Sequence, residues 1–381
     1  MHSTCDVIVL GLGAMGSATA ASLAERGLRV VAFDASAPPH NLGSSHGRSR
    51  IFRQAYFEDP AYVPLLLRAR ELWTRLERDS GRPLFHPTGA LMIGPVSGKL
   101  VTGSARSARQ FSLAHDMLSA AELRRRWPAF RVPDDTVALL EPRAGYLHPE
   151  LCIEQFLRQA TRHGAILHPD TPVSAWHADR GSATVTTARG TWTAGHLVLT
   201  AGPWTPQVLA DLHLPLRVTR QIVFWFEPLT PIDAFREDRF PVYMFETGAA
   251  EPMLYGFPLT GPNAEGLKVA VHGSNIECAP ETAPRDLRPE DERNIRQRLA
   301  TTIPALAGRL LHTETCLYTM TPDENFILGA HPEHPAVVLA AGFSGHGFKF
   351  APIVAELLAG LVATGDPHPI PAMFAPHRFS R

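Results

Sequence analysis

The feature that most constrains the fold is a short apolar run that leads directly into a glycine-rich turn. Residues 6–10, DVIVL, are typical of a buried strand, and GLGAMG at 11–16 follows at once. In such a turn Gly11 permits the tight bend, Gly13 lets a pyrophosphate approach the backbone, and Gly16 lets a helix pack closely on its strand. The sequence therefore predicts a strand, turn and helix that bind a dinucleotide phosphate at the helix N-terminus.

An acidic residue supports the same interpretation. The next apolar run, RVVAFD at 29–34, ends in Asp34, which lies 18 residues beyond Gly16. At about this distance, roughly 20 residues, an acidic side chain accepts hydrogen bonds from the adenosine ribose. The motif by itself fits both FAD and NAD.

Two later segments favour FAD. HLVLTAGPWTPQVL at 196–209 and AVVLAAGFSGHGFKFAPIVAELLAGL at 336–361 also have the form of a strand, a glycine turn and a helix. An NAD-binding domain is usually one contiguous block, whereas contributions from both ends of the chain suit the longer flavin dinucleotide. We therefore expect FAD as the cofactor.

The remaining segments alternate between strands such as QIVFWF and amphipathic helices such as VPLLLRARELWTRLER. We predict a mixed α/β fold in which a Rossmann-like FAD-binding domain is interleaved with an antiparallel-sheet substrate domain. The glycine- and serine-rich residues 94–110 are typical of an exposed connection. The expected FAD-binding domain comprises residues 1–80, 146–215 and 316–381, and the expected substrate domain comprises residues 81–145 and 216–315.

Composition narrows the class of partner. With 36 basic and 37 acidic side chains, the chain lacks the basic excess of nucleic-acid-binding proteins, so we expect a small-molecule partner. The uncharged run at 7–24 follows Asp6 and contains glycines, which argues against a secretory leader or a membrane span. The four cysteines have no paired spacing, and HPEHP at 331–335 is typical of a turn. We predict a cytoplasmic protein with no metal site and no membrane partner.

Several long stretches carry a resemblance to a known family. The chain resembles the monomeric sarcosine oxidase family, which includes N-methyltryptophan oxidase, along essentially its whole length. Arg48 departs from that pattern, because the family usually has an acidic residue there. The matching stretches are GLGAMG at 11–16, PPHNLGSSHGRSRIFRQAY at 38–56, YGFP at 255–258, GLKVAVHG at 266–273, CLYTMTPDENFILG at 316–329 and AAGFSGHGFKFAP at 340–352.

The resemblance implies an FAD-dependent oxidase of secondary, N-methyl amino acids. A hydride passes from the substrate to flavin N5, the imine is hydrolysed in water, and O2 is reduced to H2O2. A cyclic imino-acid oxidase acting on proline or pipecolate, and a flavin dehydrogenase with another electron acceptor, remain alternatives. A flavin-binding assembly module without activity is disfavoured because Lys268, Cys316 and Lys349 are all present. We expect a monomer.

The resemblance also implies which residues bind the cofactor. Cys316 would carry FAD through a thioether to the flavin 8-methyl group, although a lone cysteine is by itself more often a buried free thiol. Arg50 and His46 would lie beside the flavin. Gly345 and Gly347 belong to the glycine-rich turn that precedes Lys349.

The same resemblance implies which residues bind the substrate and which promote the reaction with O2. Arg53 and Lys349 would bind the substrate carboxylate, and Arg53 shares one face with Arg50 if this segment is helical. Lys268 would promote the reaction of reduced flavin with O2. The period of two places Lys268 and His272 on one face of a strand, about 13 Å apart, where they would serve different parts of the flavin.

Two tyrosines complete the expected substrate cavity. Tyr255 would line it together with His272. Tyr318 lies two residues beyond Cys316, so in a strand both side chains face the same side.

Overall fold

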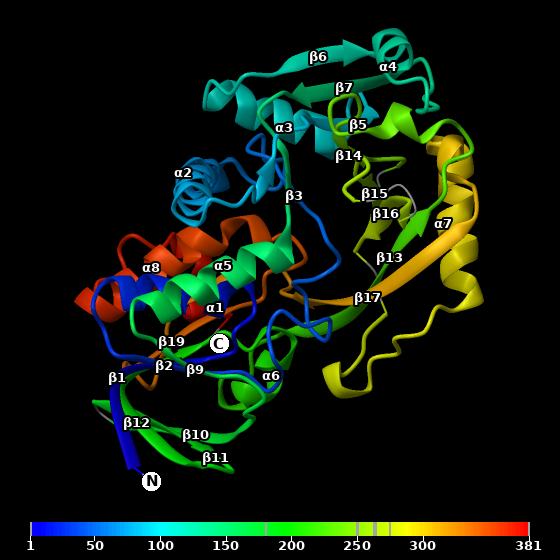
Figure 1. Cartoon of the computed structure of the whole chain (residues 1–381). Coiled ribbons are helices and arrows are strands. Elements are labelled where there is room, and N and C mark those ends of the chain that lie inside the picture. Colours follow the sequence, from blue (N-terminus) through cyan, green and yellow to red (C-terminus); the bar gives the residue numbers. More distant parts are fainter. Residues whose placement is uncertain (1, 180, 249–250, 262–264, 274–275, 380–381) are drawn as a thin grey trace.

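The computed structural model describes residues 2–179, 181–248, 251–261, 265–273 and 276–379. Figure 1 shows two large sheets, with the N-terminal strand in the lower one. The strands are β1 His2–Leu10, β2 Val30–Phe33, β3 Arg50–Phe52, β4 Phe85–His86, β5 Ala90–Pro95, β6 Asp116–Ser119, β7 Thr136–Glu141, β8 Gly145–Leu147, β9 Ile166–His168, β10 Val173–Asp179, β11 Ser182–Thr187, β12 Gly190–Leu199, β13 Arg217–Phe226, β14 Val242–Phe245, β15 Met253–Gly256, β16 Leu267–His272, β17 Leu310–Met320, β18 Ile327–Ala330 and β19 Val337–Ala341. The helices are α1 Ala14–Glu25, α2 Val63–Ser80, α3 Lys99–Gln110, α4 Ala120–Arg126, α5 Pro149–Arg162, α6 Thr205–Val208, α7 Pro289–Thr302 and α8 Ala351–Thr364.

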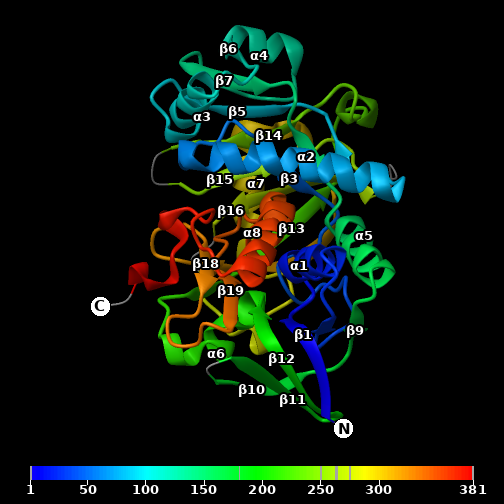
Figure 2. The ribbon, with the colours of Figure 1, turned by 90° about the vertical axis from the view of Figure 1, so that its left-hand side faces the viewer.

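The lower sheet has a parallel centre. Its order is β10-β11-β12-β1-β2-β9, and β19 adds to β12 in parallel while β18 pairs with β19. Helices α1, α5 and α8 lie over one face, and their apolar side chains form one core with strand residues such as Val9 and Val198 (Figures 1 and 2). The parallel order β12-β1-β2, with a helix directly after β1, is the arrangement expected for the first unit of a nucleotide-binding sheet.

The upper sheet has the order β17-β13-β16-β15-β14-β5-β7-β6. Neighbouring strands are antiparallel, apart from the parallel pair β14 and β5. Helices α4 and α7 contribute to the core on one face, and α3 contributes to the core on the other. A small sheet, β3-β8-β4, completes the β-structure of the described residues.

These sheets confirm the mixed α/β fold class. The predicted boundaries at 81 and 216 fall between elements, whereas those at 146 and 316 fall inside β8 and β17. The division into two domains therefore stays a prediction. No helix among the described residues is both long and apolar enough to cross a membrane.

One local expectation was wrong, and the condition attached to another is not met. The segment at 94–110 is not an exposed connection, because α3 occupies most of it and buries Leu100, Ala105 and Ala108. The segment that contains Arg50 is not helical, because it pairs as β3 with β8.

Candidate functional site

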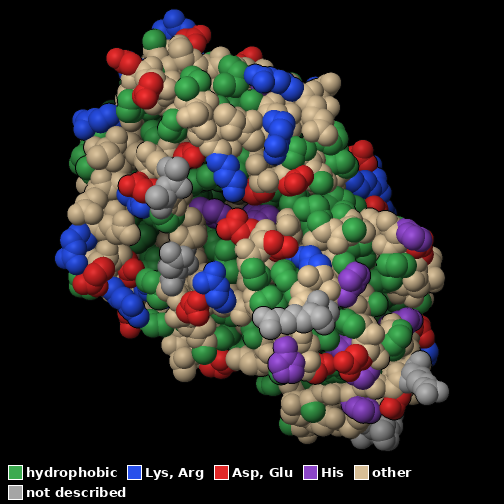
Figure 3. All heavy atoms as spheres, turned by 180° about the vertical axis from the view of Figure 1, so that it is seen from behind, with side chains coloured by type: hydrophobic (Ala, Val, Ile, Leu, Met, Phe, Trp, Pro, Cys, Tyr) green, Lys and Arg blue, Asp and Glu red, His purple; other side chains and the backbone are tan. Residues whose placement is uncertain are grey.

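A cavity of about 720 Å³ opens at the carboxyl edge of the parallel strands and continues along the upper sheet. Most predicted site residues line it, while Gly16, His46 and Lys268 lie behind its wall. On the face of the molecule drawn in Figure 3, basic and acidic side chains are interspersed, and neither charge dominates. The predicted residues that line the cavity are Gly11, Gly13, Asp34, Arg50, Arg53, Tyr255, His272, Cys316, Tyr318, Gly345, Gly347 and Lys349.

The glycine turn at 11–16 has the geometry that its sequence predicts. Gly11 has φ of +90°, and a Cβ there would lie 2.5 Å from the Thr200 carbonyl oxygen. A Cβ at Gly16 would overlap the Gly11 carbonyl oxygen. A Cβ at Gly13 would meet nothing within 4 Å, so the chain leaves this position open on the cavity side.

The start of α1 is suited to a phosphate. Gly13 is the N-cap residue, no side chain caps this described helix, and its first turn contains no acidic residue. Its first N–H groups are therefore available to an anion at the positive end of the helix dipole. The cradle that a Cβ would fill and the uncapped N-terminus together fit the pyrophosphate of a dinucleotide.

Asp34 follows β2 and lines the same part of the cavity. Its carboxylate accepts the N–H of Leu12 at 2.6 Å and the N–H of Ser36 at 3.0 Å. Each carboxylate oxygen has two lone pairs, so acceptor positions remain for ribose hydroxyls.

At the opposite end of the cavity, Arg53 and Lys349 bring two buried cations together. The Arg53 Nη2 donates to both Glu58 carboxylate oxygens, at 2.6 and 2.8 Å. Lys349 Nζ donates to the His346 carbonyl oxygen at 2.7 Å. Burial, together with the charge of Arg53, lowers the pKa of Lys349 to about 7.

The histidines at this end are neutral at physiological pH. Burial lowers the pKa of His272 to about 4 and that of His346 to about 3. His346 Nε2 lies 2.9 Å from the Glu324 carbonyl oxygen and Nδ1 lies 2.6 Å from the Tyr56 hydroxyl, so Nε2 carries the proton and Nδ1 accepts. The formal charge at this end therefore comes from Arg53, Glu58 and Lys349.

Lys268 lies behind Phe257, with Nζ 4.8 Å from the centre of that ring. Nζ donates to the carbonyl oxygens of Gly47 and Ser49, at 2.6 and 2.9 Å. Burial, followed by the positive charge of Arg50, lowers the pKa of Lys268 to about 7. The alternation predicted for β16 is observed, because Leu267 and Val269 pack in the opposite core.

The loop that Lys268 contacts contains the unusual Arg48. This residue has φ of +67°, and its guanidinium pairs with Glu265 at 2.5 Å. Glu150 accepts the N–H groups of Gly47 and Arg48, at 2.7 and 3.0 Å. The Arg48 side chain therefore points toward Glu265, and Glu150 holds the backbone of the loop that contacts Lys268.

Two tyrosines and His272 form the wall that faces the glycine-rich turn containing Gly345 and Gly347. Tyr318 Oη lies 3.4 Å from His272 Nδ1, and burial raises the pKa of Tyr255 to about 12. Gly345 has φ of +79°, and a Cβ there would overlap the Tyr318 ring. The turn can approach this wall because residue 345 lacks a side chain.

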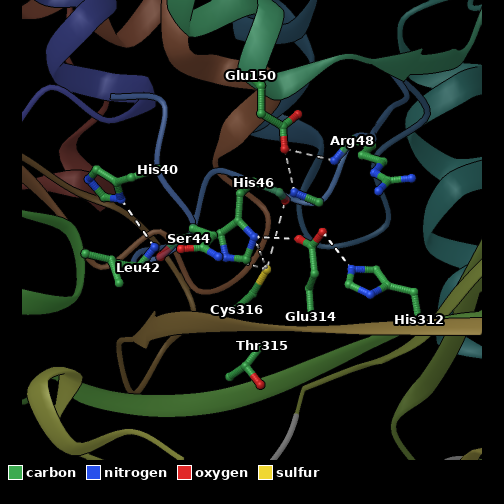
Figure 4. A network of polar contacts seen from close by, with 12 residues as sticks. His40, Leu42, Ser44, His46, Arg48, Glu150, His312, Glu314, Thr315 and Cys316 are labelled. Atoms are coloured by element: carbon green, nitrogen blue, oxygen red, sulfur yellow. Dashed lines mark hydrogen bonds and ion pairs between the residues drawn. The ribbon is translucent and has the colours of Figure 1, made fainter. Parts of the chain in front are cut away.

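Cys316 of β17 and Arg50 of β3 form a further part of the cavity wall. Arg50 Nη2 lies 3.7 Å from Cys316 Sγ and donates to the Ser44 carbonyl oxygen at 2.8 Å. His46 lies behind the thiol, with Nε2 3.3 Å from Sγ (Figure 4). The structure thus brings three predicted cofactor residues together.

The sequence patterns did not identify Glu58, His346 and Glu314 as site residues. Glu58 gave no signal beyond its position five residues after Arg53, and its contact depends on how the loop folds. Glu314 lies two residues before Cys316 in β17, so the alternation used for Tyr318 also places it on this face.

The HPEHP turn connects β18 and β19 as predicted, but Asp211 lies beside it. Ligand atoms of Asp211, His331 and His334 lie within 4.8 Å of one another. His331 Nε2 contacts Asp211 at 2.8 Å, and its Nδ1 accepts the Glu333 N–H at 3.2 Å. Both ring nitrogens of His331 are therefore already hydrogen-bonded, and we assign no metal there.

The glycine turn, the acidic residue after β2 and the long cavity define a dinucleotide-dependent enzyme site. The chain belongs to the FAD-dependent oxidoreductase family, whose match spans residues 6–361. Its fold and family thus define an FAD-dependent oxidoreductase.

Individual relatives narrow the comparison. The chain is 46% identical to a monomeric sarcosine oxidase of Streptomyces avermitilis, over 100% of this chain and 99% of that protein. It is 36% identical to an N-methyl-L-tryptophan oxidase of Yersinia pestis, over 96% of each chain. Among solved structures, NikD, an unusual amino acid oxidase essential for nikkomycin biosynthesis, superposes with a TM-score of 0.85 at 26% identity and 98% coverage of both chains.

Proposed function

We propose that this enzyme oxidises secondary amino acids, in particular N-methyl amino acids, and passes the electrons to O2. The observation that carries the proposal is one continuous cavity with a dinucleotide-binding turn at one end and the buried cations Arg53 and Lys349 at the other. Full-length similarity to proteins described as sarcosine and N-methyl-L-tryptophan oxidases supports the same substrate class.

The cation pair suits a carboxylate. A substrate carboxylate would accept hydrogen bonds from Arg53, whose planar guanidinium can donate two, and from Lys349. Glu58 already neutralises Arg53. This end of the cavity therefore carries a net positive charge whenever Lys349 is protonated. That charge favours an anionic substrate group.

The surroundings also favour a neutral amine. A positive field disfavours the protonated form of a bound amine, and the neutral His272 does not oppose this effect. Bound FAD supplies the two-electron acceptor for the C–H bond beside that amine. Tyr255, Tyr318 and Phe257 would enclose the amine and exclude water from it. No residue is assigned as a base for this step.

Lys268 is proposed to serve the oxygen reaction. Its buried ammonium is held by two backbone carbonyl groups and has no described carboxylate within ion-pair distance. When Lys268 is protonated, its positive charge stabilises negative charge that develops on O2.

We also propose that Cys316 binds FAD covalently. Its thiol lines the cavity next to Arg50. Attachment would form one carbon–sulfur bond and break the Cys316 S–H bond and one C–H bond of the flavin 8-methyl group. The two electrons and two protons that are released would reduce one O2 to H2O2, so the step balances.

We also propose that the protein is a monomer and that it lies in the cytoplasm. The names of its sarcosine oxidase relatives support the monomer. The cysteines of the chain are unpaired, which agrees with a reducing compartment.

An anaerobic substrate panel tests the proposed function. The purified holoenzyme is mixed with sarcosine, N-methyltryptophan, proline, pipecolate and an N-methylalkylamine, and the flavin absorbance is followed. We expect bleaching by an N-methyl amino acid, and H2O2 production with the same substrate in air. Bleaching by proline or pipecolate alone would instead indicate a cyclic imino-acid enzyme.

A further inference from the structure

Glu141 is a buried carboxylate at the end of β7, behind the wall of the cavity. The residue is only 2% exposed and does not belong to the cavity lining. Among the described residues no cation pairs with it, because the nearby guanidinium of Arg53 pairs with Glu58. A buried carboxylate without a counter-ion is costly unless hydrogen bonds compensate its charge. Its hydrogen bonds therefore indicate what the chain uses the charge for.

Both carboxylate oxygens accept hydrogen bonds from the backbone that directly follows Arg53. The Gln54 N–H donates to Oε1 at 2.9 Å and to Oε2 at 3.1 Å, and the Ala55 N–H donates to Oε2 at 2.9 Å. Hydrogen bonds to an ionised acceptor are stronger than those between neutral groups. Glu141 thus fixes two successive peptide groups immediately beyond β3.

Ala55 links Glu141 to the guanidinium of Arg53. Its N–H donates to Glu141, and its carbonyl oxygen accepts a hydrogen bond from Arg53 Nη1 at 3.3 Å. The other terminal nitrogen of Arg53, Nη2, is bound to Glu58. A shift of the backbone at Ala55 would therefore change the direction in which the guanidinium points.

Tyr56, the next residue, contacts both cations of the proposed substrate end. The centre of its ring lies 4.3 Å from Arg53 Cζ and 5.3 Å from Lys349 Nζ, within the range of cation–π attraction. Its hydroxyl lies 2.6 Å from His346 Nδ1, and the His346 carbonyl oxygen accepts a hydrogen bond from Lys349. The backbone that Glu141 holds therefore also places the ring against which the two cations lie.

We propose that Glu141 is a positioning residue for the substrate carboxylate, because it holds the backbone at residues 54 and 55 so that Arg53 and Lys349 converge on one anionic group. The inference rests on the proposed function, which takes these two cations as the carboxylate site. Glu141 acts through Arg53 and not by contact, since it does not line the cavity. Removal of its charge should therefore weaken carboxylate binding while both cations stay in the chain.

The electrostatics of Glu141 agree with this geometry. Burial raises its pKa, while the hydrogen bonds from Ala55 and Gln54 and the positive charge of Arg53 oppose that rise. Burial lowers the pKa of Arg53, but Glu58 and, to a smaller extent, Glu141 raise it above its usual value. Charge as well as hydrogen bonding thus couples Glu141 to Arg53.

Glu246 provides a matched control for the loss of a buried carboxylate. It follows β14 in the same sheet, is 5% exposed, and accepts the N–H groups of Lys99 and Leu100 at 3.1 and 2.9 Å. Its chemistry is therefore that of Glu141, but it holds the start of α3 and not the backbone beside Arg53. Substitution of Glu246 measures the general cost of removing such a group.

The first experiment measures binding of methoxyacetate, a carboxylate that has no amine for the flavin to oxidise. Wild-type holoenzyme, Glu141→Gln and Glu246→Gln are titrated by flavin absorbance, and urea unfolding gives the stability of each. We expect the affinity to fall at least about fivefold in Glu141→Gln and to stay within about twofold of the wild type in Glu246→Gln, although both variants lose stability. Equal affinities in the two variants would overturn the inference. Glu141→Asp, which keeps the charge but shortens its reach, replaces the glutamine variant if that protein retains no flavin, with the same expected loss.

A double-mutant cycle separates positioning from a general structural effect. In an Arg53→Ala background, Glu141→Gln should weaken methoxyacetate by no more than about twofold, because the guanidinium that it positions is absent. A loss as large as in the wild-type background would show that Glu141 acts independently of Arg53 and overturn the inference. If Arg53→Ala and Lys349→Ala leave the affinity unchanged, the proposed carboxylate site fails and this inference with it. If they weaken binding and Glu141→Gln does not, only this inference fails.

Discussion

At the nucleotide end of the cavity the chain presents backbone, whereas at the proposed substrate end it presents buried charged side chains. Gly11, Gly13 and Gly16 create space because they lack side chains. Arg53 and Lys349 instead place ionisable side chains where water is excluded. The nucleotide end therefore depends on steric fit and little on pH, while the substrate end depends on charge and responds to pH. The substitutions below test the steric fit at the nucleotide end and the charges around the rest of the cavity.

The most complete loss of function is expected at the nucleotide end. In Gly16→Ala the new Cβ would overlap the backbone oxygen of Gly11, which cannot move independently. We expect destabilisation of about 1–3 kcal/mol and loss of bound flavin. Urea unfolding and flavin absorbance per protein measure the two effects.

Gly13→Ala is the matched control for steric crowding within the protein. Nothing lies within 4 Å of its added Cβ, so stability should change by less than about 0.5 kcal/mol. Flavin retention should nevertheless fall, because the methyl group occupies the space of the phosphate. Full flavin content in this variant would contradict the assignment of Gly13 to phosphate binding.

The charge of Lys268 is expected to have the next largest effect. Lys268→Met should slow reoxidation of the reduced enzyme by O2 about 10²- to 10³-fold and change anaerobic reduction much less. Stopped-flow absorbance separates the two half-reactions, and Lys268→Arg, which keeps the charge, should retain more of the oxygen reaction. Equal slowing of both half-reactions by Lys268→Met would remove the oxygen role.

Arg53 and Lys349 should have smaller effects on binding. Arg53→Ala and Lys349→Ala should each weaken simple carboxylate inhibitors by about 1.5–3 kcal/mol, the range for hydrogen bonds to charged groups. Arg53→Lys should also lose affinity, because it removes the planar pair of donors. Spectral titration of the flavin gives the dissociation constants. Unchanged affinity in both alanine variants would exclude a carboxylate site there.

The smallest effect is a pH dependence of the same inhibitors. The pKa of Lys349 is lowered to about 7, so Lys349 is charged below that pH and loses its proton above it. Inhibitor affinity should therefore be flat below about pH 7 and fall at higher pH by at most about tenfold per unit. Lys349→Met should remove this dependence, and a decline that persists in the variant would assign it to another group.

Sequence patterns predicted the local backbone geometry around the cavity well. The period of two on β16 placed Lys268 and His272 on one face, and the glycine spacing predicted the turn before α1. The same period on β17 extends backward to Glu314, so that residue was within reach of the rule. These predictions succeed because they depend on backbone geometry within one element.

The α3 segment shows why other predictions failed. Its glycines and serines are typical of a loop, yet Glu246 accepts the N–H groups of Lys99 and Leu100 at 3.1 and 2.9 Å and satisfies the start of the helix. Gly103 lets the helix approach Phe57. A carboxylate from a distant part of the chain thus stabilises a helix that local propensity disfavours.

The sequence by itself determined the nucleotide turn, the strand faces and the family, because short-range sterics and residue spacing encode them. Only the tertiary structure decided the pairing of Arg53 with Glu58, the position of His46 between Cys316 and Glu314, and the neutral state of His272. His46 and Glu314 are 268 positions apart in the chain. Protonation depends on burial and on neighbouring charges, and folding sets both by bringing distant residues together.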